Sequence, residues 1–525
     1  MSDAQKLEAQ VRNLIRDGQL REAAQACDQL NQRFPDYDSG WYTASQLALL
    51  LKEPELGVRA IDHALTLSPG KPEWLLQRIE CMGAMGDKAG ATELARQLAP
   101  HPLDGPVLSS QFAFALSKLG LFELALPHYQ RACDLRPEDS RHFYNLATVQ
   151  RFLGDIDGAE SALDTCLRLN PADAEAHLLR SGLRPRSVES NNIDALEAAH
   201  GRAESHPKSR AQLCYALAKE LEDIGEYARA FDYLAEGSAL RRKGLRYNPD
   251  EDLKTIEAIR SSFGAEQFER DIQGHINAEP IFVVGMPRTG TTLVERVLGS
   301  HSVVKSVGEQ MTFSLQLLKH CNEVEGAPAT STSELVSRSL SVDFAALGQD
   351  YVSAARPTID PQAHFVDKMP LNFLYLGMIR LALPKAQVVL LKRDPMDTCF
   401  AVFKTLFERV YPFSYDLVEL ANYFVAYRRL TDHWLNIMPE FIHVIRYEEL
   451  VSEPRPVIED LLDYCGLSFE DNCLRFYDNK SPSTTASATQ VRRAFSRASI
   501  GNWRNYEQQL QPVADILTNA GLLLE

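Results

Sequence analysis

The stretch that decides the fold of this chain is PIFVVGMPRTGTTLVERVLGS, residues 280–300. A short apolar run ends at Gly285, Gly290 follows at the G-x-x-x-x-G spacing, and a helical pattern begins after it. This order of strand, glycine loop and helix predicts a loop whose backbone N–H groups hold an anion at a helix N-terminus. Nucleotide hydrolases carry Lys after the second glycine, whereas this chain has Thr291.

Apolar runs alternate with helical patterns through the rest of the second half. The segment AQVVLLKRDP (386–395) predicts one buried strand, and FIHVIRYEELV (441–451) predicts another. This alternation predicts a parallel sheet wound by helices, in which ligands bind beyond the carboxyl ends of the strands. An ATP or GTP enzyme needs a Mg²⁺-binding carboxylate near such a strand end, but this chain has Lys392 and Arg393 there. We therefore expect an anionic ligand that basic side chains bind directly.

The first half of the chain repeats with a period of 34 residues. Glycines, with Lys52 once in their place, and prolines 17 residues later share this period: Gly18, Gly86, Gly120, Gly154, Pro35, Pro69, Pro137 and Pro171. Small alanines recur five residues after three of the glycines, where two helices must pack closely: Ala23, Ala125 and Ala159. Repetition at this length predicts a solenoid of helix–turn–helix units.

This pattern resembles the tetratricopeptide repeat (TPR) over roughly residues 1–240. A less regular sixth unit, EDIGEYARAFDYLAEGSAL (222–240), follows the insertion RPRSVESNN (184–192). The resemblance implies an α-helical array that binds a protein or a peptide, although such repeats can also serve only to stabilise the protein or to form a homodimer. The expected domains are the TPR domain (1–240), a helical linker (241–277) and an α/β domain (278–525).

Composition limits the partners and the compartment. The chain has 525 residues and a net charge of −16, which argues against nucleic acid as the main partner. Nine cysteines include no C-x-x-C pair, so the sequence predicts neither a disulfide framework nor a metal site. We see no signal peptide and no apolar run near the roughly 18 residues of a membrane span. These features predict a cytoplasmic protein.

Six ordered motifs give the second half a family resemblance: VGMPRTGTTLVERVL, VGEQ, VDKMPLNF, LLKRDPMDTCFA, IRYEELV and ASATQVRRAFSRASIGNW. Over about residues 278–510 the chain resembles the sulfotransferases, in particular a TPR-containing bacterial branch related to the tyrosylprotein sulfotransferases. The resemblance implies a P-loop-like parallel sheet of the sulfotransferase type. It also implies 3′-phosphoadenosine-5′-phosphosulfate (PAPS) as sulfuryl donor, 3′,5′-ADP as product and no metal.

The function implied is transfer of a sulfuryl group to a hydroxyl group. The acceptor stays open among tyrosine in a protein or peptide, a sugar and a lipid, and the TPR repeats favour a protein or peptide. Two alternatives belong to other classes: a P-loop kinase or NTPase, and a TPR scaffold with an inactive catalytic domain. The missing Lys and the missing carboxylate argue against the first of these alternatives.

The resemblance assigns the anion loop to the 5′-phosphosulfate of the donor. Gly290, Thr291 and Thr292 are expected to bind this group, with Arg288 contributing both to binding and to catalysis. A sulfuryl group carries less charge than a phosphoryl group, so charge-assisted hydrogen bonds can replace a metal clamp.

Two further residues are implied in the chemistry. Glu309, in SVGEQ, matches the general base that removes the proton of the acceptor hydroxyl. Lys368, in VDKMP, matches the lysine that neutralises the bridging oxygen as the sulfuryl group leaves it. Each of these residue types is otherwise common on protein surfaces, so the assignments depend on the motif match.

The remaining donor contacts are expected from later motifs. Arg393 is implied as the bidentate ligand of the 3′-phosphate. Tyr447, in RYEELV, is implied to contact the nucleotide, and Ser487 and Gln490 fall in the segment that resembles the late PAPS-binding loop.

The 3′-phosphate motif departs from the family pattern at one position. The 3′-phosphate motif usually ends in Ser eight residues after its Arg, and this chain has Ala401. Asp394 and Pro395 predict an N-cap and a first helical position, so Ala401 should lie in the second turn of a helix. Thr398 and Lys404 lie one turn away on the same face and could supply the missing donor.

Overall fold

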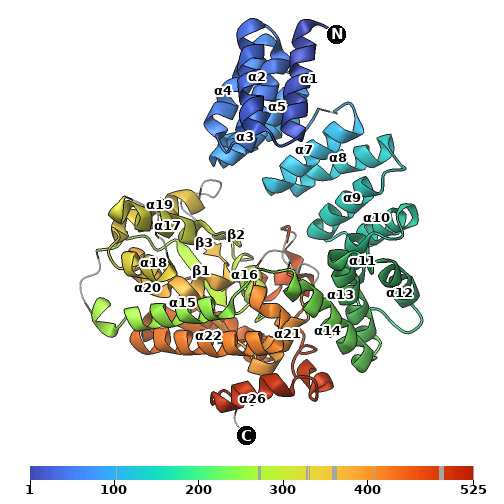
Figure 1. Ribbon diagram of the computed structural model, residues 1–525. Coiled ribbons are helices and arrows are strands. Elements are labelled where there is room, and N and C mark those ends of the chain that lie inside the picture. The colour runs from blue at the N-terminus through green and yellow to red at the C-terminus, as the bar shows by residue number, and fades with distance from the viewer. Residues whose placement is uncertain are drawn as a thin grey trace. The chain divides into compact units, whose positions relative to one another are not determined.

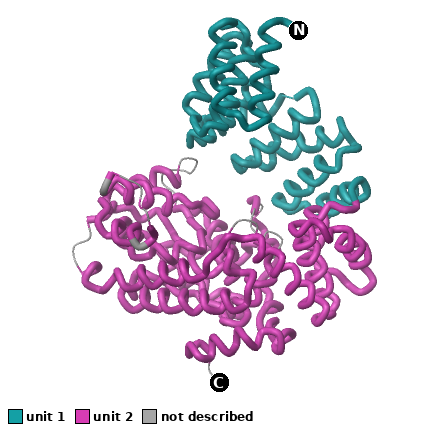
Figure 2. The backbone as a smooth tube through the Cα atoms, viewed as in Figure 1, with its two compact units in different colours: residues 1–170 teal, residues 171–525 magenta. Residues whose placement is uncertain are grey.

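The computed structural model describes residues 1–101, 103–269, 273–326, 329, 331–356, 364–407, 410–479, 481–483 and 490–523. They form two compact units, residues 1–170 and residues 171–525, coloured separately in Figure 2. The predicted domain limits at residues 240 and 278 came from the repeat and motif patterns alone and remain predictions.

Unit 1 consists of paired helices (Figure 1). Within its described residues they are α1 (Asp3–Arg16), α2 (Leu20–Arg33), α3 (Asp38–Leu50), α4 (Pro54–Leu67), α5 (Pro72–Met85), α6 (Lys88–Leu98), α7 (Pro106–Lys118), α8 (Phe122–Leu135), α9 (Ser140–Leu153) and α10 (Ile156–Leu169). The first helix of each pair begins about 34 residues after the previous one, which confirms the predicted repeat.

The periodic residues occupy the positions that the repeat requires. Gly86 and Gly154 end α5 and α9 in the left-handed region, with φ of +90° and +87°. Lys52 has a φ of +63° at the position where the period lacks a glycine. The periodic alanines of α2, α8 and α10 are fully buried, as close helix packing demands.

Unit 2 begins with further helices of the same kind. They are α11 (Ala174–Ser181), α12 (Ile193–Arg202), α13 (Pro207–Asp223), α14 (Tyr227–Lys243) and α15 (Pro249–Ser262). Gly225, with a φ of +83°, separates α13 from α14, as predicted for the sixth repeat. These helices pack onto the rest of unit 2. Nε of Arg242 lies 2.8 Å from Oε2 of Glu419, and the Tyr215 hydroxyl donates a hydrogen bond to the carbonyl of Phe403 at 3.3 Å.

The remainder of unit 2 is built around a parallel sheet. Its strands are β1 (Pro280–Gly285), β2 (Val304–Gly308), β3 (His364–Asp367), β4 (Gln387–Lys392) and β5 (Ile442–Arg446). Their order in the sheet is β2-β3-β1-β4-β5, and every paired neighbour is parallel. The predicted fold class, a helical TPR-like array followed by an α/β domain with a parallel sheet, is therefore confirmed.

Helices cover both faces of the sheet. They are α16 (Thr291–Leu298), α17 (Thr312–Glu325), α18 (Thr332–Ser339), α19 (Phe344–Ala355), α20 (Leu376–Ala382), α21 (Pro395–Phe403), α22 (Leu417–Ile437), α23 (Tyr447–Ser452), α24 (Pro454–Tyr464), α25 (Asp471–Leu474) and α26 (Gln511–Asn519). Phe282 and Val388 point into one buried core and Val283 and Val389 into the other, so successive strand residues face opposite sides. Among the described residues, no helix combines the length and the apolar character needed to cross a membrane.

Candidate functional site

Four of the five described strands lead directly into a residue predicted for the site, and the loop after the fifth, β1, carries another. Glu309 follows β2, Lys368 follows β3 and Arg393 follows β4. Tyr447 follows β5, and the loop after β1 carries Arg288. Because carboxyl ends of parallel strands share one edge of a sheet, the fold gathers these side chains along that edge.

The loop after β1 has the shape that its glycines predict. Gly290 caps α16 with a φ of +102°, and a Cβ at this position would lie 2.7 Å from Cδ2 of Tyr447. Arg288 has a φ of +67°, which is uncommon for a residue with a side chain. Thr291 and Thr292 open α16, where the first backbone N–H groups have no partner within the helix. The local backbone is thus arranged to accept an anion.

A cavity of about 380 Å³ lies against this loop, within the size range of small-molecule sites. Its lining includes seven residues predicted from the sequence: Arg288, Gly290, Thr291, Thr292, Arg393, Lys404 and Tyr447. It also includes residues that the sequence analysis did not single out, among them Phe400, Phe476, Arg493, Phe495, Ser499 and Asn502. The late motif that contains most of these additions was recognised, but its individual contacts were not.

Arg393 is held at the cavity wall by neutral groups. Its guanidinium donates to the carbonyl of Arg288 at 3.0 Å and to the carbonyl of Ser499 at 2.7 Å. Its guanidinium carbon lies 4.7 Å from the ring centre of Tyr447, while its buried Nε has no hydrogen-bond partner among the described atoms.

Lys392, the residue before Arg393, has a different environment. Its ammonium pairs with Asp432 at 2.9 Å, and the residue does not line the cavity. The expectation that Lys392 and Arg393 both bind the ligand is therefore wrong for Lys392.

The cavity carries positive charge that favours an anion. Burial, and then the nearby charge of Arg393, lower the pKa of Arg288 to about 10. Arg493 also lines the cavity and makes no hydrogen bond or ion pair with a described residue. An anion between these guanidinium groups would relieve their mutual repulsion.

The helix after β4 begins as predicted. Asp394 is the N-cap of α21 and accepts a hydrogen bond from the backbone N–H of Asp397 at 2.8 Å, with Pro395 in the first turn. Sequence reasoning missed the role of Asp397, whose carboxylate accepts from the N–H groups of Gly501 at 2.6 Å and Trp503 at 3.4 Å. Asp397 therefore fastens the late motif to the cavity wall.

The two residues expected to replace the missing serine differ in their placement. Ala401 and Lys404 both line the cavity, but the Lys404 ammonium lies 2.7 Å from the carboxylate of Glu222 on α13. Thr398 is fully buried, and its hydroxyl donates to the carbonyl of Asp394 at 2.8 Å. The prediction that Thr398 could face the 3′-phosphate is therefore wrong.

A second cluster of charges lies at the ends of β2 and β3. The Lys368 side chain is fully buried, and its ammonium contacts the carboxylate of Glu309 and lies 3.5 Å from that of Glu295. Glu295, on α16, also accepts a hydrogen bond from the Ser306 hydroxyl at 2.5 Å, whereas the Glu309 side chain is 41% exposed. Sequence reasoning missed Glu295, because its partner Lys368 is distant along the chain.

Asp367 supports the residue beside it, Lys368. Its buried carboxyl accepts hydrogen bonds from the Tyr351 hydroxyl at 2.9 Å and the Asn372 amide at 3.3 Å. Burial raises the pKa of Asp367 to about 7. This network fixes the end of β3, from which Lys368 extends.

Two predicted donor contacts cannot be placed. Ser487 lies outside the described residues. Gln490 begins a short 3₁₀ helix that ends at Arg492, and its side chain likewise lies outside the described part. Their assignment remains a prediction.

Comparisons with known proteins agree with the motifs. Residues 280–471 match the sulfotransferase family, and residues 141–173 match the tetratricopeptide repeat. The chain carries a sulfotransferase family domain and a tetratricopeptide repeat. The matched sulfotransferase region contains the five residues that follow the strand ends.

Two relatives illustrate how far the similarity extends. An uncharacterised protein of Aquifex aeolicus strain VF5 is 30% identical over 499 residues, which cover 91% of this chain and 64% of that protein. The chain thus spans less than two thirds of the length of this relative. A protein of Caenorhabditis briggsae named "Putative protein-tyrosine sulfotransferase" is 24% identical over 241 residues, or 42% of this chain and 80% of that protein.

Solved structures with low sequence identity are similar to parts of the chain. The sulfotransferase domain of the olefin synthase from Synechococcus PCC 7002 is 16% identical, with a TM-score of 0.35, and covers 49% of this chain and 99% of its own. YrrB, described as a TPR protein with an unusual peptide-binding site, is 17% identical, with a TM-score of 0.28, and covers 40% of this chain and 97% of its own.

A second cavity adjoins the first in the unit that holds the sulfotransferase domain. It measures about 430 Å³ and shares four lining residues with the first: Arg288, Lys404, Arg493 and Asn502. Its other wall comes from α13 and α14 and includes Tyr215, Lys219, Glu222 and Tyr227. Repeat-type helices thus contribute directly to the surroundings of the candidate site.

Proposed function

We propose that the protein is a PAPS-dependent sulfotransferase that transfers a sulfuryl group to a hydroxyl group of a protein or peptide, with tyrosine as the acceptor side chain. One observation carries the proposal. An arginine-lined cavity adjoins the anion loop, and a buried lysine paired with a partly exposed carboxylate lies on the same sheet edge. The first arrangement suits an anionic nucleotide, and the second suits proton removal and charge neutralisation.

The residues of the cavity fit such a donor. Thr291, Thr292 and Arg288 would hold the 5′-phosphosulfate, and Arg393 with Arg493 would hold the 3′-phosphate. The unpartnered Nε of Arg393 and the lowered pKa of Arg288 both favour an anion at this place. When bound, PAPS supplies an activated sulfuryl group attached to a phosphate leaving group.

The Lys368–Glu309 pair would have to open for the reaction. An acceptor hydroxyl would take the place of the ammonium at Glu309, which then removes its proton as the oxygen bonds to sulfur. Lys368 would neutralise the negative charge left on the bridging oxygen as the sulfuryl group leaves it for the acceptor. Glu295 would keep Lys368 in position after Glu309 has turned to the acceptor.

The residues fit a kinase or NTPase less well. Thr291 takes the place of the phosphate-binding lysine. Among the described residues of the cavity lining, the one carboxylate is Asp397, and it is already bonded to two backbone N–H groups. A Mg²⁺ ion would have to compete with those bonds.

The repeats are proposed to present the acceptor or a partner protein to this site. Repeat arrays of this type bind protein segments, and α13 and α14 already form part of a cavity wall. We propose a cytoplasmic location, since all nine cysteines lie within the described residues and are buried free thiols.

Transfer of ³⁵S from labelled PAPS to the components of a cell lysate tests the proposal. Wild type should label the protein fraction and release 3′,5′-ADP, Glu309→Gln should do neither, and Glu440→Gln should behave as wild type. Glu440 is a suitable control because it is exposed and forms no ion pair with a described residue. Label in carbohydrate or lipid would reject a protein acceptor but keep sulfuryl transfer. The absence of both label and 3′,5′-ADP release would reject the proposed reaction.

A further inference from the structure

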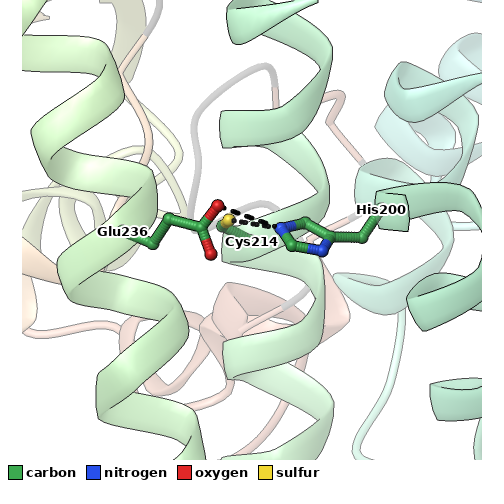
Figure 3. A group of neighbouring side chains, drawn as sticks. All are labelled: His200, Cys214 and Glu236. Carbon is green, nitrogen blue, oxygen red and sulfur yellow. Dashed lines mark hydrogen bonds and ion pairs between the residues drawn. The ribbon is translucent and has the colours of Figure 1, made fainter. Parts of the chain in front are cut away.

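Three side chains from different helices of unit 2 converge on one point (Figure 3). His200 lies on α12, Cys214 on α13 and Glu236 on α14. The Nε2 atom of His200 lies 3.2 Å from Oε1 of Glu236 and 3.4 Å from Sγ of Cys214. All three potential ligand atoms lie within 4.8 Å of one another. The cluster takes no part in the reaction proposed above.

These separations are close to those around a tetrahedral zinc ion. With zinc bonds of about 2.0–2.3 Å to nitrogen, oxygen and sulfur, ligand atoms lie about 3.4 Å apart for nitrogen and oxygen and about 3.6 Å apart for nitrogen and sulfur. The two separations from Nε2 are within about 0.2 Å of these values, and the sulfur and the carboxylate oxygen lie within 4.8 Å of each other. A movement that brings the sulfur and that oxygen closer together would place all three atoms at bonding distance of one ion.

The contacts of His200 also favour a shared ion. A single ring nitrogen, Nε2, faces both the carboxylate of Glu236 and the sulfur of Cys214. An imidazole nitrogen carries either one hydrogen or one lone pair, so it makes one strong directed bond. A metal ion bound to that lone pair would bond the carboxylate and the thiolate at the same time.

The surroundings hold these side chains in place. Arg210 donates a hydrogen bond to Oε1 of Glu236, the same oxygen that faces His200, and the ring of Tyr233 packs edge-on against His200 with 5.4 Å between centres. Cys214 is fully buried, while the side chains of His200 and Glu236 are 12% and 32% exposed. Metal-binding carboxylates are commonly fixed by such outer hydrogen bonds, and the exposed side leaves room for a water molecule.

We propose that His200, Cys214 and Glu236 bind a divalent transition-metal ion, with Zn²⁺ best suited to this nitrogen, sulfur and oxygen set and water as the fourth ligand. The ion would join α12, α13 and α14, and α13 carries the Glu222 that contacts Lys404. Its role is therefore structural and it stabilises the repeat-type wall beside the donor cavity. The sequence predicted no such site, because the spacings of 14 and 22 residues match no metal motif.

Cobalt binding tests the site without reference to sulfuryl transfer. The full chain, without a polyhistidine tag, is stripped with chelator, returned to metal-free buffer and titrated with CoCl₂. Wild type should bind one Co²⁺ with a near-ultraviolet thiolate charge-transfer band and visible bands of a four-coordinate ion. Added ZnCl₂ should abolish these bands.

Matched variants separate this site from other cysteines. Cys214→Ser should lose the charge-transfer band, and Glu236→Gln should weaken Co²⁺ binding by at least about tenfold. Cys133→Ser, which changes a buried cysteine of α8, should keep both properties. Glu236 is partly exposed, so its variant tests the site even if Cys214→Ser fails to fold. The proposal is overturned, leaving a hydrogen-bonded cluster only, if wild type gives no thiolate band or if the band survives in Cys214→Ser.

Discussion

The arginine-lined cavity, which is the proposed donor cavity, and the Lys368 cluster share one sheet edge but balance their charges in opposite ways. In the cavity, Arg393 bonds backbone carbonyls, and Arg493 has no partner among the described residues. In the cluster, Lys368 contacts two carboxylates, Glu295 and Glu309. The cavity thus offers positive charge to an external anion, whereas the ammonium of Lys368 is already paired with carboxylates of the chain. Binding and chemistry should therefore respond to different substitutions.

The largest separation is expected from Glu309→Gln. Loss of the general base should lower turnover by about 10²–10⁴. The affinity for 3′,5′-ADP should stay nearly unchanged, because Glu309 does not line the donor cavity. Steady-state rates and calorimetry on the same preparations measure both quantities. Turnover at the wild-type rate would remove Glu309 from the chemistry.

Arg393→Lys should show the reverse behaviour. Lys cannot reproduce the bidentate contact to the 3′-phosphate, so 3′,5′-ADP binding should weaken by roughly 1.5–3 kcal/mol. Adenosine 5′-phosphosulfate lacks that phosphate and should lose much less affinity in calorimetric titrations. If both ligands weaken equally, Arg393 only supports the fold, and the contrast between cavity and cluster disappears.

Glu295→Gln sharpens the comparison within the cluster. This change keeps the hydrogen bond from Ser306 but removes the negative charge that pairs with the Lys368 ammonium. Stabilisation of the transition state should therefore fall by roughly 0.5–1.5 kcal/mol, with a matching loss of turnover. Ser306→Ala is the matched control, since it leaves the Glu295–Lys368 contact intact. A loss as large as that of Glu309→Gln, measured under saturating donor, would show that Glu295 and not Glu309 is the essential carboxylate.

The smallest effect is expected in the cavity, from Ala401→Ser. One regained hydrogen bond to the donor should tighten PAPS binding by roughly 0.5–1.5 kcal/mol. Lys404 also faces this position, although Glu222 holds its ammonium. A double-mutant cycle with Lys404→Ala measures whether the two side chains serve the same phosphate. Additive effects would indicate that Lys404 serves the contact to α13 alone.

The repeat array could be predicted because its signals are local. A 34-residue period fixes each turn, and even Lys52 adopts the left-handed backbone of the glycine that it replaces. Some strand ends could also be predicted, since a short apolar run followed by a charged motif indicates both the strand and the residue at which it ends. Arg393 follows such a run, whereas Glu309 and Lys368 were assigned through their family motifs.

Contacts between distant segments could not be read from the sequence. Glu295 meets Lys368, and Glu222 meets Lys404, only because the tertiary fold brings them together. Thr398 was wrongly expected at the cavity, because helical spacing gives the face of a residue but not the bond that its hydroxyl makes. Local patterns therefore predicted which residues lie along the sheet edge better than which of them form pairs.

The most direct test of the central claim is the binding of 3′,5′-ADP to the wild-type chain in the presence of EDTA, measured by calorimetry beside ATP with Mg²⁺. A cavity that binds a nucleotide through arginines should take 3′,5′-ADP without any metal and prefer it to ATP with Mg²⁺. Binding of ATP only with Mg²⁺, or of neither nucleotide, would contradict the proposed donor site.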